Sequence, residues 1–277
     1  MKKKAVKMLL YPNCKINLGL NVLRKRSDGY HDLETLFYPV NATEAIVIEP
    51  SELFSFKVEG IAIDGDLKDN LCVKAWDLIN NRFDLPSVSI TLYKYLPMGA
   101  GLGGGSADAA YVIKGLNQLF DLGMSEIEMA EIAAILGSDA PFFIYNKPMI
   151  ATGRGEVLAP LDFSLSNYHV RLIKPSFGIS TKEAYSGITP TDDNSLTIEQ
   201  IVELPVEKWQ GLLKNDFERH LFKKYPELAQ IKEELKQQGA VYAAMSGSGS
   251  TIFGLFEEAP SSYFVKPGYW CWTGQLY

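Results

Sequence analysis

The sequence lacks several features that define common functional classes. Its 277 residues include only three cysteines, Cys14, Cys72 and Cys271, and their spacing contains no CxxC pair. This argues against a disulfide framework or a structural zinc site. No apolar run is long enough to span a bilayer. The basic start, residues 1–4, leads into a short apolar stretch that Lys7 interrupts, without a small-residue cleavage site. We therefore expect a cytoplasmic protein with no membrane partner.

Clustered positive charge is also absent. The formal net charge is −6 at pH 7, and no basic stripe with interleaved aromatic residues occurs. Nucleic acid is therefore a poor candidate partner. An acidic protein that binds an anionic ligand needs a local pocket lined by cations or backbone amides. The hydrophobic fraction of 47% and the charged fraction of 22% are typical of a globular protein.

Strands and helices mix along the chain without a strict βαβα rhythm, which favours an α+β fold. A change of character after residues 153–155 suggests two domains, 1–153 and 154–277. Alternating apolar residues predict strands over 8–26, 30–40, 46–49, 53–58, 88–95 and 169–173, and a strand, Ser-Gly turn and strand over 240–256. Helical spacing and capping signals predict helices over 70–83, from near Ser106, over 125–136, from Ser180, and in a long region that ends at Gly239.

The most informative segment is Pro97–Ala110, where a predicted strand runs into a glycine-rich loop and then a helix. Glycines let the backbone approach a ligand closely, and the new helix adds unpaired N–H groups and the positive end of its dipole. A flexible turn is the simpler alternative. Five glycines in seven positions cost roughly 0.5–1 kcal/mol each relative to alanine in regular structure, which a mere connector would not need. The sequence therefore favours a phosphate site.

Two known phosphate-binding patterns fit this loop incompletely. Gly99-x-Gly101-x-x-Gly104 matches the dinucleotide-binding pattern, but the distant acidic residue, Asp121, follows the helix directly and no second strand intervenes. Gly99-x-x-x-x-Gly104 begins a Walker A motif, but Gly105 stands where the lysine belongs. The protein-kinase signatures are absent as well.

The same segment resembles the second motif of the GHMP small-molecule kinases, which include galactokinase, homoserine kinase and mevalonate kinase. Three further segments resemble motifs of this family in the same order. They are Cys14–Leu18, Gly137–Phe143 and Ala244–Ser250. The Gly-Gly-Ser-Ala-Asp form of the loop, Asp28–His31 and Tyr225–Leu228 are most similar to the family member that acts on a cytidine diphosphate-linked methylerythritol.

The resemblance implies a two-domain α+β kinase fold and phosphorylation of this small-molecule substrate by ATP with Mg²⁺, in a monomer or homodimer. It places ATP at Asn70, Pro97, Gly99, Gly101, Leu102, Gly103, Gly104, Gly105, Ser106 and Ala107. It places the acceptor substrate at Asn17, Tyr30, His31, Tyr185, Gly247 and Ser248. No cluster of carboxylates marks a metal site, so the metal ligands stay unknown.

The resemblance also implies a catalytic pair. Asp139 would accept the proton of the acceptor hydroxyl, and Lys15 would orient both groups and stabilise their negative charge. From local sequence alone, Ser138-Asp139-Ala-Pro141 favours a helix N-cap, and a solvated strand face is the commoner place for a lysine such as Lys15. Ser106 could touch phosphate or Mg²⁺, or simply cap its helix.

Other functions remain as competitors. The chain could be another GHMP kinase, of the homoserine or mevalonate type, although Asp28–His31 and the form of the glycine loop argue against this. It could also be a non-catalytic nucleotide sensor on the same scaffold, but a sensor needs neither Lys15 nor Asp139. The histidines at 169 and 220 are interpreted as structural, and the aromatic tail 266–277 has no assigned role.

Overall fold

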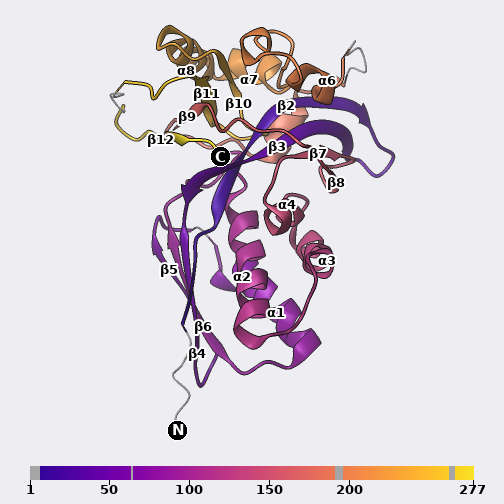
Figure 1. Ribbon diagram of the computed structural model, residues 1–277, viewed down its shortest axis with the longest axis vertical. Helices are drawn as coiled ribbons and strands as arrows, with labels where there is room; N and C mark the ends of the chain where they lie inside the picture. The colour runs from indigo at the N-terminus through magenta and orange to yellow at the C-terminus, as the bar shows by residue number, and fades with distance from the viewer. Residues whose placement is uncertain (1–6, 64, 191–195, 262–265) are drawn as a thin grey trace. The chain divides into compact units, whose positions relative to one another are not determined.

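The computed structural model describes residues 7–63, 65–190, 196–261 and 266–277 (Figure 1). The basic start at residues 1–4 lies outside these residues. Helices and sheets form two compact units, which confirms the α+β class. The first unit comprises the described residues within 1–14, 42–98 and 103–146, and the second comprises those within 15–41, 99–102 and 147–277. No helix in the described ranges has the length and apolar character needed to cross a bilayer.

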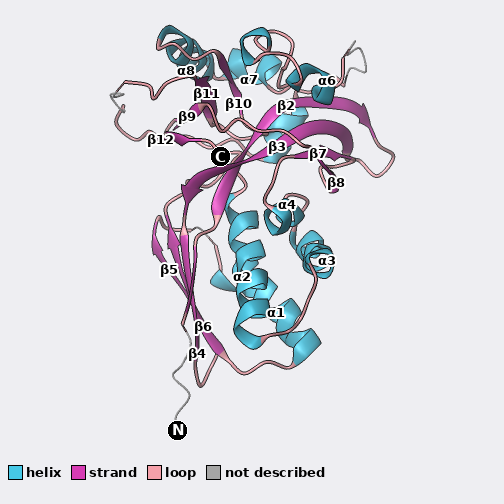
Figure 2. Ribbon diagram, in the orientation of Figure 1, coloured by secondary structure: helices cyan, strands magenta, loops and turns pink. Residues whose placement is uncertain are grey.

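The first unit is built on a four-stranded sheet in the order β1-β4-β6-β5. Strand β4 pairs antiparallel with β1 and β6, whereas β5 runs parallel to β6. Helices α1 and α2 lie along one face of this sheet (Figure 2). The elements are β1 (Met8–Leu10), β4 (Ala45–Pro50), β5 (Ser55–Gly60), β6 (Val88–Lys94), a short 3-10 helix η1 (Leu67–Asp69), α1 (Leu71–Phe83), α2 (Gly104–Phe120), α3 (Glu126–Leu136) and α4 (Ala140–Tyr145).

Local sequence explains where these helices begin. The side chain of Asn70 caps α1 by accepting a hydrogen bond from the Cys72 N–H at 2.9 Å. Ser125 and Glu128 form the predicted capping box of α3, which ends at Gly137 as expected. Helix α2 begins at Gly104, two residues before the predicted start near Ser106. The correction arises because Gly103, in the left-handed region with φ 73°, occupies the N-cap position.

The second unit contains two four-stranded sheets, ordered β2-β3-β7-β8 and β10-β11-β9-β12. Helices α7 and α8 share a core with strands of both sheets, including Leu20, Phe217, Ile231 and Ile252. The elements are β2 (Asn13–Lys25), β3 (His31–Thr43), β7 (Met149–Thr152), β8 (Val157–Pro160), β9 (His169–Lys174), α5 (Thr181–Ser186), α6 (Ile198–Val202), η2 (Val206–Lys208), α7 (Glu218–Lys224), α8 (Pro226–Gln237), β10 (Tyr242–Met245), β11 (Ile252–Phe256) and β12 (Trp270–Gln275).

Two features of the chain differ from the sequence-based expectation, and a third, the aromatic tail 266–277, had no expectation attached. The long strand predicted over 8–26 divides into β1 and β2, and β2 is buried on both faces from Asn13 to Val22. The long helical region that ends at Gly239 is a series of short helices. The aromatic tail forms β12, which pairs antiparallel with β9 at the edge of its sheet.

Candidate active site

Lys15 lies in β2 and is 3% exposed, so its predicted alternative, a solvated strand face, is wrong. Its ammonium nitrogen donates to Asn17 Oδ1 at 2.5 Å and to the Gly101 carbonyl at 3.3 Å. The same nitrogen lies 4.8 Å from the centroid of the Phe37 ring, an arrangement that favours a cation. Burial among oriented acceptors gives this lysine a defined direction that a surface lysine lacks.

Two glycine-rich segments predicted separately meet within the second unit. The Ser246 hydroxyl donates to the Gly101 carbonyl at 3.0 Å, and the Thr251 N–H donates to the Ala100 carbonyl at 3.2 Å. A β-carbon at Gly101 would collide with the Ser246 carbonyl, and one at Gly249 would collide with the Gly101 amide. Gly101 also has φ 77°, which other residues rarely adopt. Glycine is therefore required here for loop packing as well as for any approach of a ligand.

The start of α2, in the first unit, has the properties of an anion site. Gly103 has no side chain to cap the helix, and Gly104 and Gly105 form its first turn. The unpaired N–H groups at such a terminus favour negative charge. Ser106 lies inside the first turn, so the simple N-cap interpretation of this residue is wrong.

A buried ion network, which was not predicted from the sequence, supports this helix start. Lys94 Nζ contacts Glu44 Oε2 at 2.6 Å and Asp108 Oδ2 at 2.8 Å, and all three side chains are at most 4% exposed. Glu44 Oε1 accepts the Leu96 N–H at 2.8 Å. A β-carbon at Gly104 would lie 3.3 Å from Lys94 Nζ, so the ammonium lies directly behind the first turn of α2.

Burial raises the pKa of Asp108 well above its usual value, although Lys94 opposes this shift. Burial alone would lower the pKa of Lys94, but the charges of Asp108 and Glu44 outweigh it and raise that pKa. The network therefore keeps a charged lysine between two carboxyl groups, and burial shifts the equilibrium of Asp108 toward protonation relative to an exposed aspartate. A signal was present in β6, because Lys94 continues the buried series Val88, Ile90, Leu92.

Asp139 occupies the N-cap position of α4, with Pro141 in the first turn. Its carboxylate accepts no capping hydrogen bond from this helix, every residue of which the structure describes. The local N-cap interpretation is therefore right about position but not about the bond. A β-carbon at the preceding Gly137 would lie 3.9 Å from Ser106 Oγ, so this segment lies beside the first turn of α2. The pairing of Asp139 with Lys15 stays a prediction.

The aromatic residues predicted to recognise substrate lie within the second unit. The rings of His31 and Tyr185 are stacked, with centroids 5.0 Å apart and planes 23° from parallel. Tyr30, the neighbouring residue, is 58% exposed. Burial, with a smaller effect from the charge of Lys25, lowers the pKa of His31 below its ordinary value. The imidazole is therefore neutral at pH 7 and offers both a donor and an acceptor.

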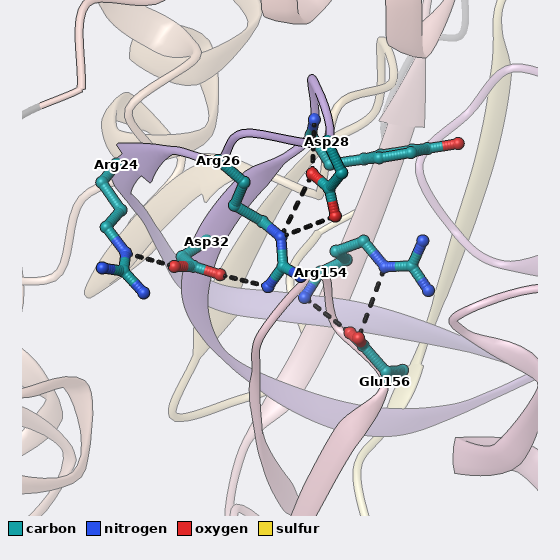
Figure 3. Close-up of polar contacts among 7 residues, drawn as sticks. Arg24, Arg26, Asp28, Asp32, Arg154 and Glu156 are labelled. Atoms are coloured by element: carbon teal, nitrogen blue, oxygen red, sulfur yellow. Dashed lines mark hydrogen bonds and ion pairs between the residues drawn. The ribbon is translucent and has the colours of Figure 1, made fainter.

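Charged side chains hold the turn that carries Tyr30 (Figure 3). Asp32 contacts Arg24, and it also accepts from Arg26 Nη1 at 2.8 Å. Arg26 Nε in turn contacts Asp28 at 3.0 Å, and Asp28 accepts the Tyr30 N–H at 3.1 Å. This backbone hydrogen bond, with the contact to Arg26, lowers the pKa of Asp28 despite partial desolvation. Asp32 is partly buried, whereas the arginines and Asp28 reach solvent, so the pairs orient the turn more than they stabilise it.

Arg154 approaches the same tyrosine from the β7–β8 connection. Its guanidinium carbon lies 5.0 Å from the centroid of the Tyr30 ring, and its Nε contacts Glu156 at 3.4 Å (Figure 3). A cavity of 420 Å³ lies beside the turn, lined by Leu23, Arg24, Asp32, Leu33, Thr152 and Gly153. No local sequence pattern predicts a role for Arg154.

The remaining predicted residues have clear local contacts. Gly247, with φ 57°, lies against the Asn17–Lys15 contact, since a β-carbon there would be 3.0 Å from Asn17 Oδ1. The Ser248 hydroxyl lies 3.3 Å from Thr181 Oγ1. Within the described ranges, no group of three or more histidine, cysteine, aspartate or glutamate side chains is arranged to hold a metal ion.

The described residues thus include a buried lysine, a helix start with glycine in its first turn, and a stacked pair of aromatic rings beside an exposed tyrosine. Family models named GHMP kinases N terminal domain and GHMP kinases C terminal match residues 70–147 and 199–265. The chain belongs to the GHMP kinase family, which confirms the resemblance and the predicted enzyme class.

Individual relatives within the family show which kinases this chain is similar to. A 4-diphosphocytidyl-2-C-methyl-D-erythritol kinase of Bacteroides fragilis is 48% identical over 90% of this chain and 92% of its own length. A solved structure of a 4-(cytidine 5'-diphospho)-2C-methyl-D-erythritol kinase is 32% identical, with a TM-score of 0.76 over 90% of both chains. A mevalonate kinase structure covers 90% of this chain at 14% identity with a TM-score of 0.70, and this likeness concerns the fold alone.

Proposed function

We propose that this kinase transfers the γ-phosphoryl group of ATP to the 2-hydroxyl of 4-diphosphocytidyl-2-C-methyl-D-erythritol, in the non-mevalonate route to isoprenoid precursors. One observation carries the choice of substrate. The 48% identity to a kinase named for this compound extends over 90% of the chain.

The residues at the start of α2 fit the phosphates of ATP, because an uncapped helix terminus with glycine in its first turn exposes backbone N–H groups. In the proposal Asn70 and Pro97 border the adenine, and the phosphates lie against Gly99, Gly101, Leu102, Gly103, Gly104, Gly105, Ser106 and Ala107. Mg²⁺ enters with the phosphates of ATP, as is usual for this ion, and the proposal assigns no protein ligands to it.

Asp139 accepts the proton of the substrate hydroxyl as the phosphoryl group moves, and Lys15 stabilises the negative charge that develops. Phosphoryl transfer needs little covalent chemistry from the protein, so positioning and charge stabilisation dominate its catalysis. Two observations support these roles. Lys15 is buried and directed by Asn17 and Gly101, and Asp139 starts α4 in the segment that lies beside the first turn of α2.

Tyr30, His31 and Tyr185 recognise the cytosine of the substrate. A neutral imidazole can donate to and accept from a base edge, and an exposed tyrosine ring offers a stacking surface. Asn17, Gly247 and Ser248 contact the polyol or phosphate portion.

The experiment is a phosphotransfer assay with ATP and Mg²⁺ across a panel of 4-diphosphocytidyl-2-C-methyl-D-erythritol, homoserine, mevalonate and galactose. We expect turnover with the first compound alone. Turnover confined to another compound would overturn the substrate while leaving the kinase class intact. Binding of ATP without turnover of any compound would favour the nucleotide sensor.

Three further properties belong to the proposal. The chain works in the cytoplasm, as a monomer or homodimer, and its sequence domains are 1–153 and 154–277. Light scattering after size-exclusion chromatography measures the oligomeric state, and limited proteolysis that cuts near residues 153–155 would support the boundary.

A further inference from the structure

Thr35 lies on β3, is 1% exposed, and is bonded to the residues around Lys15. Its hydroxyl donates to the Gly19 carbonyl at 2.5 Å and accepts from Asn17 Nδ2 at 3.0 Å. Asn17 Oδ1 then faces Lys15 Nζ at 2.5 Å. Thr35 thus begins a chain of hydrogen bonds that ends on the proposed catalytic lysine.

The direction of each bond follows from counting protons. A carbonyl can only accept, so the single hydroxyl proton of Thr35 must point to Gly19. The Thr35 oxygen can then only accept from Asn17, which requires the NH₂ end of the amide to face it. The other end of the chain agrees, because an ammonium group has no acceptor and needs the amide oxygen opposite it.

The carbonyl that begins this chain is held in place by packing. Gly19 lies in the left-handed region, with φ 69°, in the middle of β2. A β-carbon there would lie 2.7 Å from Leu213 Cδ1 and 3.0 Å from Ile198 Cδ1. The local backbone turn therefore requires glycine and fixes the direction of its carbonyl.

At the other end, the Asn17 backbone is fixed too, since its N–H donates to Ser246 Oγ at 3.2 Å. With this backbone fixed, the hydrogen bond from Asn17 Nδ2 to Thr35 Oγ1 determines which end of the amide group faces Lys15. With the amide reversed, its NH₂ group would face the Lys15 ammonium, donor against donor.

We propose that Thr35 is a positioning residue for phosphoryl transfer, which sets the Asn17 amide so that its oxygen directs Lys15. This inference rests on the proposed function, in which Lys15 acts on the transferring group. Thr35 is enclosed at 1% exposure, so it acts through Asn17 without touching substrate.

The test is kinetic and compares Thr35→Val with Thr35→Ser. Valine keeps the shape and removes both hydrogen bonds, whereas serine keeps the hydroxyl. A single net hydrogen bond corresponds to as much as a factor of about ten, so we expect Thr35→Val to lower kcat about tenfold. The KM for ATP should stay within about twofold of the wild type, and Thr35→Ser should restore most of kcat.

A double variant tests the route through Asn17. If Thr35 acts through that amide, Thr35→Val should lower kcat little further in an Asn17→Ala background. Thr273→Val is the matched control, because it removes a β-strand hydroxyl that accepts from Arg171 Nε at 3.0 Å, in the other sheet of the second unit. We expect its kcat to equal that of the wild type.

Three results would overturn the inference: wild-type kcat in Thr35→Val, failure of serine to restore kcat, or fully additive losses in the double variant. A wild type that phosphorylates no compound of the panel would instead refute the proposed function. In that case the positioning of Asn17 by Thr35 is tested without an enzyme assay, by measuring hydrogen exchange of the Asn17 side-chain amide with NMR. Thr35→Val should exchange about tenfold faster than the wild type and Thr35→Ser, and equal rates in all three would refute the positioning.

Discussion

Replacing Lys94 by methionine should strongly destabilise the first unit. The substitution keeps an unbranched side chain of similar length but removes the cation between Glu44 and Asp108. The carboxyl groups of those residues are at most 3% exposed, so water cannot replace the lost ammonium. Glu44 also accepts the N–H groups of Tyr95 and Leu96, which lead into the glycine loop.

The expected magnitude follows from burial. Removing one partner of a buried ion pair costs about 3–5 kcal/mol, because the remaining charge is left without compensation. For a domain of this size, each kcal/mol lowers Tm by about 2–4 °C. Lys94→Met should therefore lower the Tm by roughly 6–20 °C.

The measurement is thermal unfolding by circular dichroism, with urea unfolding as an independent check. Lys57→Met is the matched control, because Lys57 contacts Glu59 on β5 of the same sheet and its side chain is 67% exposed. Exposed pairs contribute little, so its Tm should change by no more than about 2 °C. Equal melting temperatures for the Lys94 and Lys57 variants would refute the reasoning about buried charge.

The pH dependence of stability tests the same network. Burial raises the pKa of Asp108, so the folded state holds a proton that the unfolded state releases. This stabilisation is complete below the ordinary pKa of aspartate, about 3.9, and is lost as pH rises through the raised folded value. The Tm of Asp108→Asn, whose side chain is neutral at every pH, should therefore rise relative to the wild type as pH increases. A Tm difference that is independent of pH would contradict this.

Three further predictions concern turnover. Asp139→Asn should lower kcat by about 10²–10⁴-fold while calorimetry shows nearly unchanged ATP affinity, and near-normal turnover would remove the assigned role. Because burial lowers the pKa of His31, its ring is neutral above pH 7, and the KM for the cytidine substrate should rise as pH falls below the ordinary histidine value; His31→Gln should flatten that rise. Arg154→Leu should raise this KM about two- to fivefold by freeing the Tyr30 ring, with the KM for ATP as the internal control.

Local signals predicted much of the fold correctly. The capping box at Ser125 and Glu128 and the cap at Ser180 are both present. The alternation of Val88, Ile90 and Leu92 gave the right strand, β6. These features depend on residues close together in the sequence, where propensity and capping chemistry decide the structure.

The contacts that define the candidate site were harder to predict from the sequence. Nothing local in the sequence indicates that Gly101 packs against Ser246, or that Thr35 bonds Asn17, because these partners come together only through the sheet topology. The burial of both faces of β2 was likewise missed, and with it the buried position of Lys15. Lys94 was the one overlooked residue with a readable signal, a lysine on the apolar face of a strand.

The packing of Gly101 against Ser246 also determines when, during synthesis of the chain, the glycine loop can be completed. These residues are 145 positions apart, so a ribosome exposes the first glycine segment long before the turn that completes it. The helices and sheet of the first unit can form from local contacts while the peptide is still growing. The glycine loop reaches its finished shape only after β10 and the Ser246–Ser250 turn emerge. Under the proposed function, the loop becomes able to bind nucleotide only late in synthesis of the chain.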